Sequence, residues 1–288
     1  MKKIGLLLVG FAFLVSCVSS AQSPERPGNA VERLVTYDDF NATQIDPDKW
    51  FGWTCSTEPR SAGTEAIRQI QDNRLRLVYR AYGRTDSDSG MSRNELGLVF
   101  HNSAAVTAIK ATVQVTDAAA TSCPGNPEAT ISLAMLGGRF FGTAPSTPGS
   151  AANDVVANIR LVRRSDSTDP PDVLRVRSGV SHCANAVCTA GSTIHFQDLG
   201  PVKLGEMVRL RVQWDRDNHR FIFQRDDDPE VLAPYTVSDS APPGDQFKRL
   251  GAVHFVPNCT ATPRPVAFIE ALFDDVMVNE SEAPRAVR

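Results

Sequence analysis

The chain lacks several features that would assign it to a common class of protein. Its N-terminal apolar segment, residues 4–15, is shorter than the roughly 20 residues that a transmembrane helix needs. Only 6 of its 30 basic residues are lysine, the basic residues are scattered, and the formal net charge is -3. This balance argues against a nucleic-acid partner. With 42% hydrophobic and 22% charged residues among 288, the composition instead indicates a folded chain with a buried core.

The N-terminus has the layout of a secretory signal. Lys2 and Lys3 precede the apolar segment 4–15, as the positive and hydrophobic parts of such signals do. Residues 14–17, Leu-Val-Ser-Cys, resemble the bacterial lipoprotein box, in which the cysteine becomes acylated. We therefore expect a signal over residues 1–21 with lipidation at Cys17, and a flexible tether over 22–34. This predicts an exported outer-membrane lipoprotein that contacts the membrane through its lipid anchor only; ordinary cleavage after residues 19–21, giving a periplasmic or secreted protein, is the alternative.

The cysteines fit an oxidising compartment better than a metal site. Six are present: Cys17, Cys55, Cys123, Cys183, Cys188 and Cys259. We expect a disulfide between Cys183 and Cys188, because their four intervening residues can close a small loop. Two of the three cysteines in the polar segments around residues 55, 123 and 259 can also pair, and the sequence leaves open which two. No C-x-x-C motif is present, so zinc binding is not expected.

Short alternating segments dominate the rest of the chain. Apolar and polar residues alternate with a period of two, as in strands with one buried face, over residues 74–80, 96–100, 109–116, 130–135 and 208–214. Turn residues separate these segments, and no internal repeat is visible. The best helix candidate is a turn or two at residues 46–50. Such a pattern of short strands is typical of a single sandwich or barrel.

Three segments carry a resemblance to a known superfamily. Tyr-Asp-Asp-Phe-Asn at 37–41, with Ile45 and Trp50 following, opens the domain. The second segment, residues 205–215, ends in Trp-Asp and leads through a turn into Arg-Phe-Ile-Phe-Gln at 220–224. The third, Ala-Leu-Phe-Asp-Asp-Val-Met-Val at 271–278, closes the domain. In order and spacing these resemble the concanavalin A-like lectin and glucanase superfamily. The resemblance implies an all-β, two-sheet antiparallel jelly-roll sandwich as a single domain at 35–280, a C-terminal tail at 281–288, and a concave sheet that often carries a glycan groove.

The hydrolytic motif of that superfamily is absent. Its laminarinase-type hydrolases read E-(I/L)-D-x-x-E on one strand, because retaining hydrolysis needs two carboxyl groups about 5–5.5 Å apart. No E-x-D-x-x-E occurs in this chain, and the corresponding segment, residues 154–163, presents Asn158 and Arg160 on one face. We therefore do not expect hydrolysis by that mechanism. Whether the protein is an enzyme stays open, and the absence of the E-x-D-x-x-E motif favours a binding protein.

A partial match to alginate-lyase-type jelly rolls keeps a second chemistry open. These proteins read R-x-E-L-R, then Q-I-H, then a strand that supplies a tyrosine. Arg93 and Glu95 match most of the first motif and His195 matches the end of the second, but the tyrosine strand is missing. The resemblance implies that Arg93 neutralises a uronate carboxylate and that His195 assists. The alternatives are a salt bridge between Arg93 and Glu95, and a loop or edge-strand position for His195.

Two further groove candidates and one weak metal candidate complete the site prediction. His254 alternates with Leu250, Ala252 and Val256, which favours a buried histidine and leaves a groove position as the alternative. Glu270 lies in an apolar strand and must face a groove or pair with an arginine, because an unpaired buried charge is costly. Asp86 and Asp88 have the D-x-D-x-G spacing of calcium loops but lack the later acidic ligand, so a polar turn explains them equally well.

From these features we expect non-catalytic binding of a polysaccharide, envelope glycan or other surface ligand at the bacterial envelope. The alternatives are a polysaccharide-active enzyme, a lyase more than a hydrolase, and a purely structural or adhesion protein. No cofactor is expected apart from the calcium alternative. Aromatic residues make up 7% of the chain. Trp50 and Trp53 are expected to pack in the core, and a position in a groove wall is the alternative for either.

Overall fold

The described part of the chain is built from β-strands, with one short 3-10 turn at Arg216–Asn218 (η1). The computed structural model describes residues 33–56 and 64–279. One sheet, here the back sheet, has the order β13 (Val231–Pro234), β12 (Arg220–Arg225), β11 (Met207–Asp215), β6 (Ala108–Ala120), β15 (Val266–Asn279), β4 (Arg74–Tyr82) and β3 (Thr64–Gln71), with β1 (Leu34–Asp38) paired to β15. The other, here the front sheet, has the order β10 (Gly191–Lys203), β9 (Val173–Cys183), β8 (Asp154–Arg164), β7 (Ile131–Gly142), β14 (Lys248–Pro257), β5 (Met91–Phe100) and β2 (Trp50–Ser56).

The fold prediction is confirmed. Every strand pairing is antiparallel, and the two sheets enclose one large core, as in an antiparallel jelly-roll sandwich. The strands begin at Leu34, one residue before the predicted domain start, and end at Asn279. The signal, Cys17, nearly all of the tether and the tail at 281–288 lie outside the described residues. No helix in 33–56 or 64–279 is long and apolar enough to span a membrane.

Period-two alternation produces the strands where it was expected. Along β4 the odd-numbered Leu75, Leu77 and Tyr79 are buried, whereas the residues between them are partly exposed. The helix predicted at residues 46–50 is wrong: a turn lies there, and Trp50 already begins β2. Trp50 is in the core, not in a groove wall, because its ring packs 4.5 Å from that of Phe100.

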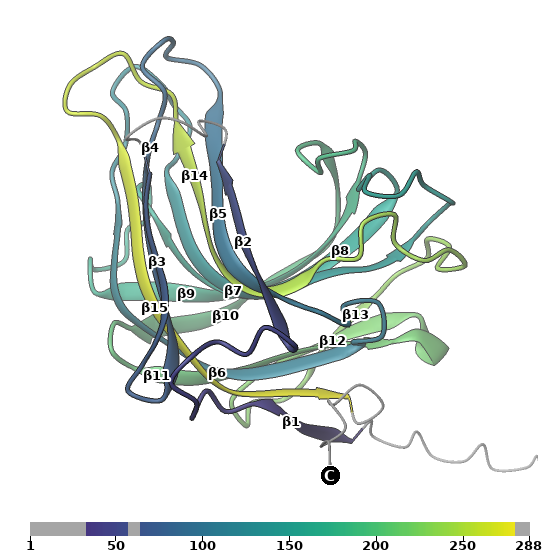
Figure 1. The fold of residues 1–288 in the computed structure, drawn as a ribbon. Coiled ribbons are helices and arrows are strands. Elements are labelled where there is room, and N and C mark those ends of the chain that lie inside the picture. Colours follow the sequence, from purple (N-terminus) through teal and green to yellow (C-terminus); the bar gives the residue numbers. More distant parts are fainter. Residues whose placement is uncertain (1–32, 57–63, 280–288) are drawn as a thin grey trace, which may run out of the picture. The chain divides into compact units, whose positions relative to one another are not determined.

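The front sheet is strongly bent, and this bend positions the site. In Figure 1 strands β5, β14, β7 and β8 bend together, and the concave side of the bend faces away from the back sheet. The core-facing side of these strands carries Leu98, Leu250, Leu136 and Ile159. Since side chains alternate between the two faces of a strand, their neighbours in sequence point into the concave face.

Two disulfides are present among the described residues. Cys183 and Cys188 are bonded, as predicted. Cys123 and Cys259 form the second disulfide across a sequence separation of 136 residues. Cys55 was expected in a loop, but it lies on β2, exposed and unbonded. Strand β2 was not predicted because its sequence and its burial show no alternation, and its partner, β5, is more than 30 residues later in the chain.

Candidate functional site

The concave face of the front sheet holds a pocket built by five strands. It encloses about 140 Å³, close to the roughly 150 Å³ of a cavity that accommodates one benzene ring. We name it the arginine pocket. Its lining consists of Trp53, Arg93, Glu95, Leu133, Met135, Gly138, Arg139, Val156, Asn158, Arg160, Cys188, Asp245, Phe247, Arg249, Val253 and Phe255. The pocket therefore has room for one small ring, with four guanidinium groups and three aromatic rings around it.

Glu95 is the central anion of the pocket. It accepts hydrogen bonds from Arg93 Nε at 2.6 Å, from Arg249 Nη1 at 2.7 Å and from Trp53 Nε1 at 3.3 Å. Its side chain is 6% exposed, and that of Arg249 is 5% exposed. Burial opposes ionisation of this carboxyl, but the guanidiniums of Arg249 and Arg93 hold the pKa of Glu95 at about 2. Glu95 is therefore a fixed carboxylate that orients two arginines.

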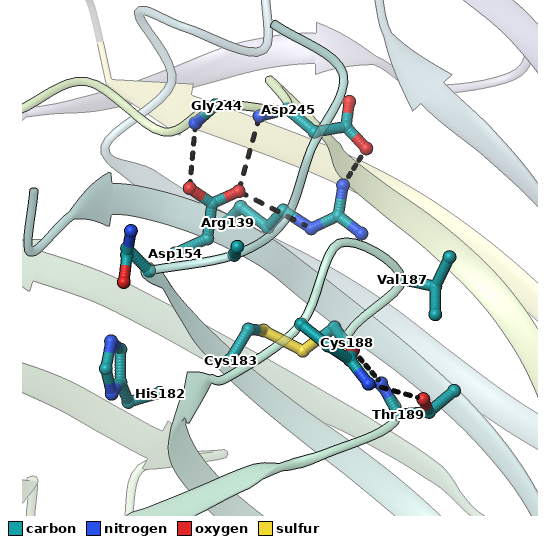
Figure 2. Close-up of a disulfide and its surroundings, with 12 residues drawn as sticks. Arg139, Asp154, His182, Cys183, Val187, Cys188, Thr189, Gly244 and Asp245 are labelled. Carbon is teal, nitrogen blue, oxygen red and sulfur yellow. Dashed lines mark hydrogen bonds and ion pairs between the residues drawn. A yellow bond between two sulfur atoms is a disulfide. The ribbon is translucent and has the colours of Figure 1, made fainter. Parts of the chain in front are cut away.

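The short disulfide loop forms one rim of the pocket. Arg93 Nη1 donates to the backbone oxygens of Val187 and Cys188 at 3.3 and 3.2 Å. Figure 2 shows the Cys183–Cys188 bond at the base of this loop, with Val187 projecting from its tip. Through these two carbonyl groups, the loop helps Glu95 to fix the position of the Arg93 side chain.

A second charged cluster lies beside the disulfide loop. Arg139 lies 3.8 Å from Asp154 through Nε and forms an ion pair with Asp245 (Figure 2). Asp154 is fully buried and accepts hydrogen bonds from the backbone amides of Gly244 at 2.7 Å and Asp245 at 3.3 Å. Burial raises the pKa of Asp154 and lowers that of Arg139, and each charge partly offsets the effect on the other. This cluster fixes the loop at residues 244–245 against the sheet.

Asn158 and Arg160 lie on β8 without such partners. The Nε of Arg160 and the Oδ1 of Asn158 are buried and have no hydrogen-bond partner among the described residues. Arg160 also borders a second hollow of about 150 Å³, lined by Ile131, Leu133, Arg160, Val162, Arg164, Arg177, Phe196 and Phe255. Burial, Arg177 and Arg164 lower the pKa of Arg160 to about 10. At neutral pH this residue is therefore a cation beside two adjoining hollows.

Guanidinium groups lie against two of the three aromatic rings of the pocket, those of Phe247 and Phe255. Phe247 lies 4.8 Å from the guanidinium carbon of Arg249 and 5.5 Å from that of Arg139. The ring of Trp53 contacts Phe247 edge-on at 5.0 Å, and Arg93 lies 5.8 Å from the ring of Phe255. These contacts hold arginines and rings together as one surface of mixed polar and aromatic character.

Of the seven groove residues expected from the sequence, the structure brings four together: Arg93, Glu95, Asn158 and Arg160. The other three lie elsewhere. His254 is fully buried in the core, where it stacks on Tyr79 and shares a hydrogen bond of 3.0 Å with the Tyr79 carbonyl. His195 faces the back sheet and stacks on Phe223 at 6.0 Å.

Glu270 requires the clearest correction. It lies on β15 of the back sheet, not on the concave face, and pairs with Arg76 at 2.7 Å. Of the two expected environments, a groove or an arginine partner, Glu270 has the arginine partner. Arg76 is the partner because β4 is the strand paired with β15.

The acidic turn at Asp86 and Asp88 does not gather its carboxylates at one point. Asp86 pairs with Arg84, whereas Asp88 accepts hydrogen bonds from the amide and hydroxyl of Thr260, both at 2.7 Å. Asp88 also lies near Cys123 and Cys259, but these two sulfurs are joined in a disulfide and so are not free thiolate ligands. Calcium binding here stays a prediction.

Sequence reasoning missed Arg139, Arg249, Phe247 and Asp245. A signal for Arg249 was available, because His254 was assigned to the same face as Leu250. On β14 that assignment places the odd-numbered residues, Arg249 among them, on the opposite face. Phe247 and Asp245 precede the strand, and nothing in the sequence indicates that their loop folds over the pocket.

Comparisons with known proteins assign the chain to no family. No protein-family model matches the chain, and no curated protein matches it in sequence. Among solved structures, it is similar to a GlcNAcα1-4Gal-releasing endo-β-galactosidase from Clostridium perfringens, with 11% identity and a TM-score of 0.38, covering 88% of this chain and 65% of that one. An alginate lyase from Klebsiella pneumoniae shares 12% identity (TM-score 0.39, covering 81% and 95%). A glycoside hydrolase family 16 endo-glucanase from Bacteroides ovatus shares 12% (TM-score 0.36, covering 83% and 97%). These values are too low to carry over an activity or a ligand.

Proposed function

We propose that this protein binds a glycan in the arginine pocket without cleaving it, and that it does so at the bacterial envelope. The observation that carries the proposal is a concave pocket in which four arginines and three aromatic rings surround space for one ring. Ligand sites are typically concave, with a few fixed polar groups among apolar walls. Guanidinium groups offer several donors to sugar oxygens, while the ring of Trp53 offers an apolar face.

The polar groups of the pocket favour binding over catalysis. Its lining contains no histidine, tyrosine or lysine among the described residues. A general acid for glycoside cleavage needs a raised pKa, whereas the arginines hold the pKa of Glu95 at about 2. The other lining carboxylate, Asp245, is paired with Arg139. His195, which the lyase alternative requires near the substrate, stacks on Phe223 in the core instead.

Export and anchoring complete the proposal. The two disulfides support an oxidising compartment, since disulfides persist there. Acylation of Cys17 is the proposed anchor, and stable anchoring takes more than one acyl chain. We expect cells grown with labelled palmitate to label the protein, and a Cys17→Ala variant to remain unlabelled. Equal labelling of both would remove the anchor from the proposal.

The glycan proposal is tested with the purified protein on a glycan array, in calcium and in chelator, alongside an absorbance assay for unsaturated sugar products. We expect saturable binding without product. Trp53→Ala should weaken binding at least about tenfold, as for an aromatic side chain at the centre of a contact. Phe51→Ala is the matched control, because this exposed ring lies on the same strand outside the pocket lining.

The outcomes separate the alternatives. Absence of glycan binding under both conditions would refute the proposal and favour a structural or adhesion role. Unsaturated product from a uronate polymer would replace it by the lyase alternative. Binding that disappears in chelator would favour the calcium alternative at Asp86 and Asp88.

A further inference from the structure

Arg160 differs from the other arginines of the pocket in having no partner. Arg93 and Arg249 bind Glu95, and Arg139 binds Asp154 and Asp245. The side chain of Arg160 forms no hydrogen bond or ion pair with any residue of 33–56 or 64–279, and its Nε is buried. Three of the four guanidiniums are thus neutralised from within the fold, and one is not.

The other arginines around Arg160 have acidic partners. Directly across the strand pairing lies Arg177 on β9, which forms an ion pair with Asp198 at 3.5 Å. The lining of the second hollow includes Arg160, Arg164 and Arg177 and no carboxylate, but Arg164 binds Asp166 at 2.8 Å just outside it. Arg160 is therefore the arginine of this lining whose charge no described carboxylate offsets.

An uncompensated cation in this position is costly to the fold. The Arg160 side chain is only partly exposed, so its charge is partly removed from water without a partner to offset the loss, and buried polar groups are nearly always hydrogen-bonded. The Oδ1 of Asn158, two residues before Arg160 on the same face, is likewise buried without a partner. Two adjacent side chains that the fold leaves unsatisfied are explained most simply by a ligand that supplies both partners.

We propose that Arg160 binds the carboxylate or sulfate group of an acidic sugar, and that Asn158 accepts a hydrogen bond from a hydroxyl of the same sugar. The planar guanidinium matches such anions with two parallel hydrogen bonds. Because Arg160 borders both the arginine pocket and the second hollow, the acidic sugar lies at their junction, with neighbouring sugars on either side. This inference rests on the proposed glycan binding and narrows it to acidic glycans.

The test measures affinity by calorimetry for three sets of oligosaccharides: alginate fragments, sulfated dextran fragments, and unsulfated dextran fragments. Arg160→Met removes the charge with an apolar side chain of similar length, and Arg160→Lys keeps the charge but not the planar fork. Arg80→Met is the matched control, because Arg80 is a paired arginine on the back sheet. Urea unfolding of each variant monitors folding, and Arg160→Met should be at least as stable as the parent.

We expect the parent to bind an acidic set at least tenfold more tightly than the neutral set, and to lose affinity as salt is raised. Arg160→Met should lose at least tenfold toward acidic fragments, Arg160→Lys should lose less, and Arg80→Met should be unchanged. Preference for alginate or for sulfated dextran identifies the anionic group. Equal binding of acidic and neutral fragments, unaffected by Arg160→Met, would overturn this inference while leaving glycan binding intact; binding of none of the three sets would overturn both.

Discussion

Replacing Glu95 by glutamine is the most direct test of how the pocket is held together. The substitution keeps the size of the side chain and one hydrogen-bond acceptor, but removes the charge between Arg93 and Arg249. The Glu95 and Arg249 side chains are 6% and 5% exposed, so solvent does little to compensate. Removing one partner of a buried ion pair costs about 3–5 kcal/mol, because the remaining charge is left unpaired.

The pKa of Glu95 gives a second measure of the same interaction. Folding lowers this pKa from 4.5 to about 2, and each unit corresponds to about 1.4 kcal/mol. The charge of Glu95 therefore contributes about 3 kcal/mol to the free energy of unfolding at pH 7. Because the pKa is lowered on folding, this contribution is complete above pH 4.5 and is lost as the pH falls toward 2. At pH 3 only about 1 kcal/mol remains.

The measurement is urea unfolding of the parent and Glu95→Gln at pH 7 and at pH 3. We expect the free energies of unfolding to differ by about 3 kcal/mol at pH 7 and by about 1 kcal/mol at pH 3. Glu65→Gln is the matched control, because the Glu65 carboxylate pairs with Arg80 but its side chain is 64% exposed; it should lose less than about 1 kcal/mol. A loss below about 1 kcal/mol for Glu95→Gln at pH 7, or an equal loss at both pH values, would refute the reasoning.

Three further predictions concern other buried groups. Burial lowers the pKa of Lys248 to about 7, whereas the unfolded chain holds this proton up to about pH 10.5. Between pH 7.5 and 9.5 the free energy of unfolding of the parent should therefore rise by about 1.4 kcal/mol per pH unit relative to that of Lys248→Met. Parallel plots of the two free energies against pH would contradict this. Burial lowers the pKa of His254 to about 4, below its value of 6.5 in the unfolded chain. Protonation of the unfolded chain should therefore reduce the free energy of unfolding by about 3 kcal/mol between pH 6.5 and 4, and His254→Gln should not show this loss. Replacing both cysteines of the Cys183–Cys188 disulfide by alanine should cost only about 2 kcal/mol, because the closed loop is short. It should nevertheless weaken glycan binding, because the loop carbonyls that hold Arg93 are released; calorimetric affinity equal to that of the parent would argue against this role of the rim.

The strands were predictable because their signal is local. In β4 and β6 one face packs in the core and the other meets solvent or polar neighbours, so apolar residues recur at every second position. The signal fades in β14, where nearly every residue is buried, because the bend of the front sheet covers its outer face as well. The pairings between strands were not predictable, since β14 joins β5 and β7 from more than 100 residues away.

The candidate site was predicted in part for the same reason. Because side chains alternate between the two faces of a strand, the sequence correctly placed Arg93 on the same face as Glu95, and Asn158 on the same face as Arg160. It could not show that Arg249 reaches Glu95, because the two residues are 154 positions apart. It also could not show which face of a strand would line the groove, so a groove position stayed an alternative for His195 and His254, which point into the core.

Glu95 and Glu270 show what the sequence does not contain. Each is a carboxylate in an apolar strand, and each pairs with an arginine at 2.7 Å. Side chains on the inside of a bent sheet converge, so Glu95 collects Arg93, Arg249 and Trp53 and is nearly excluded from solvent. Glu270 lies on the outer face of the back sheet, where it pairs with Arg76 alone and both side chains stay 20–26% exposed. The alternation along a strand shows which face each residue lies on, but the direction in which the sheet bends decides which face becomes a pocket. That direction arises only when strands distant in sequence pair across the front sheet, so a search for the ligand site must begin from the curvature of the sheet.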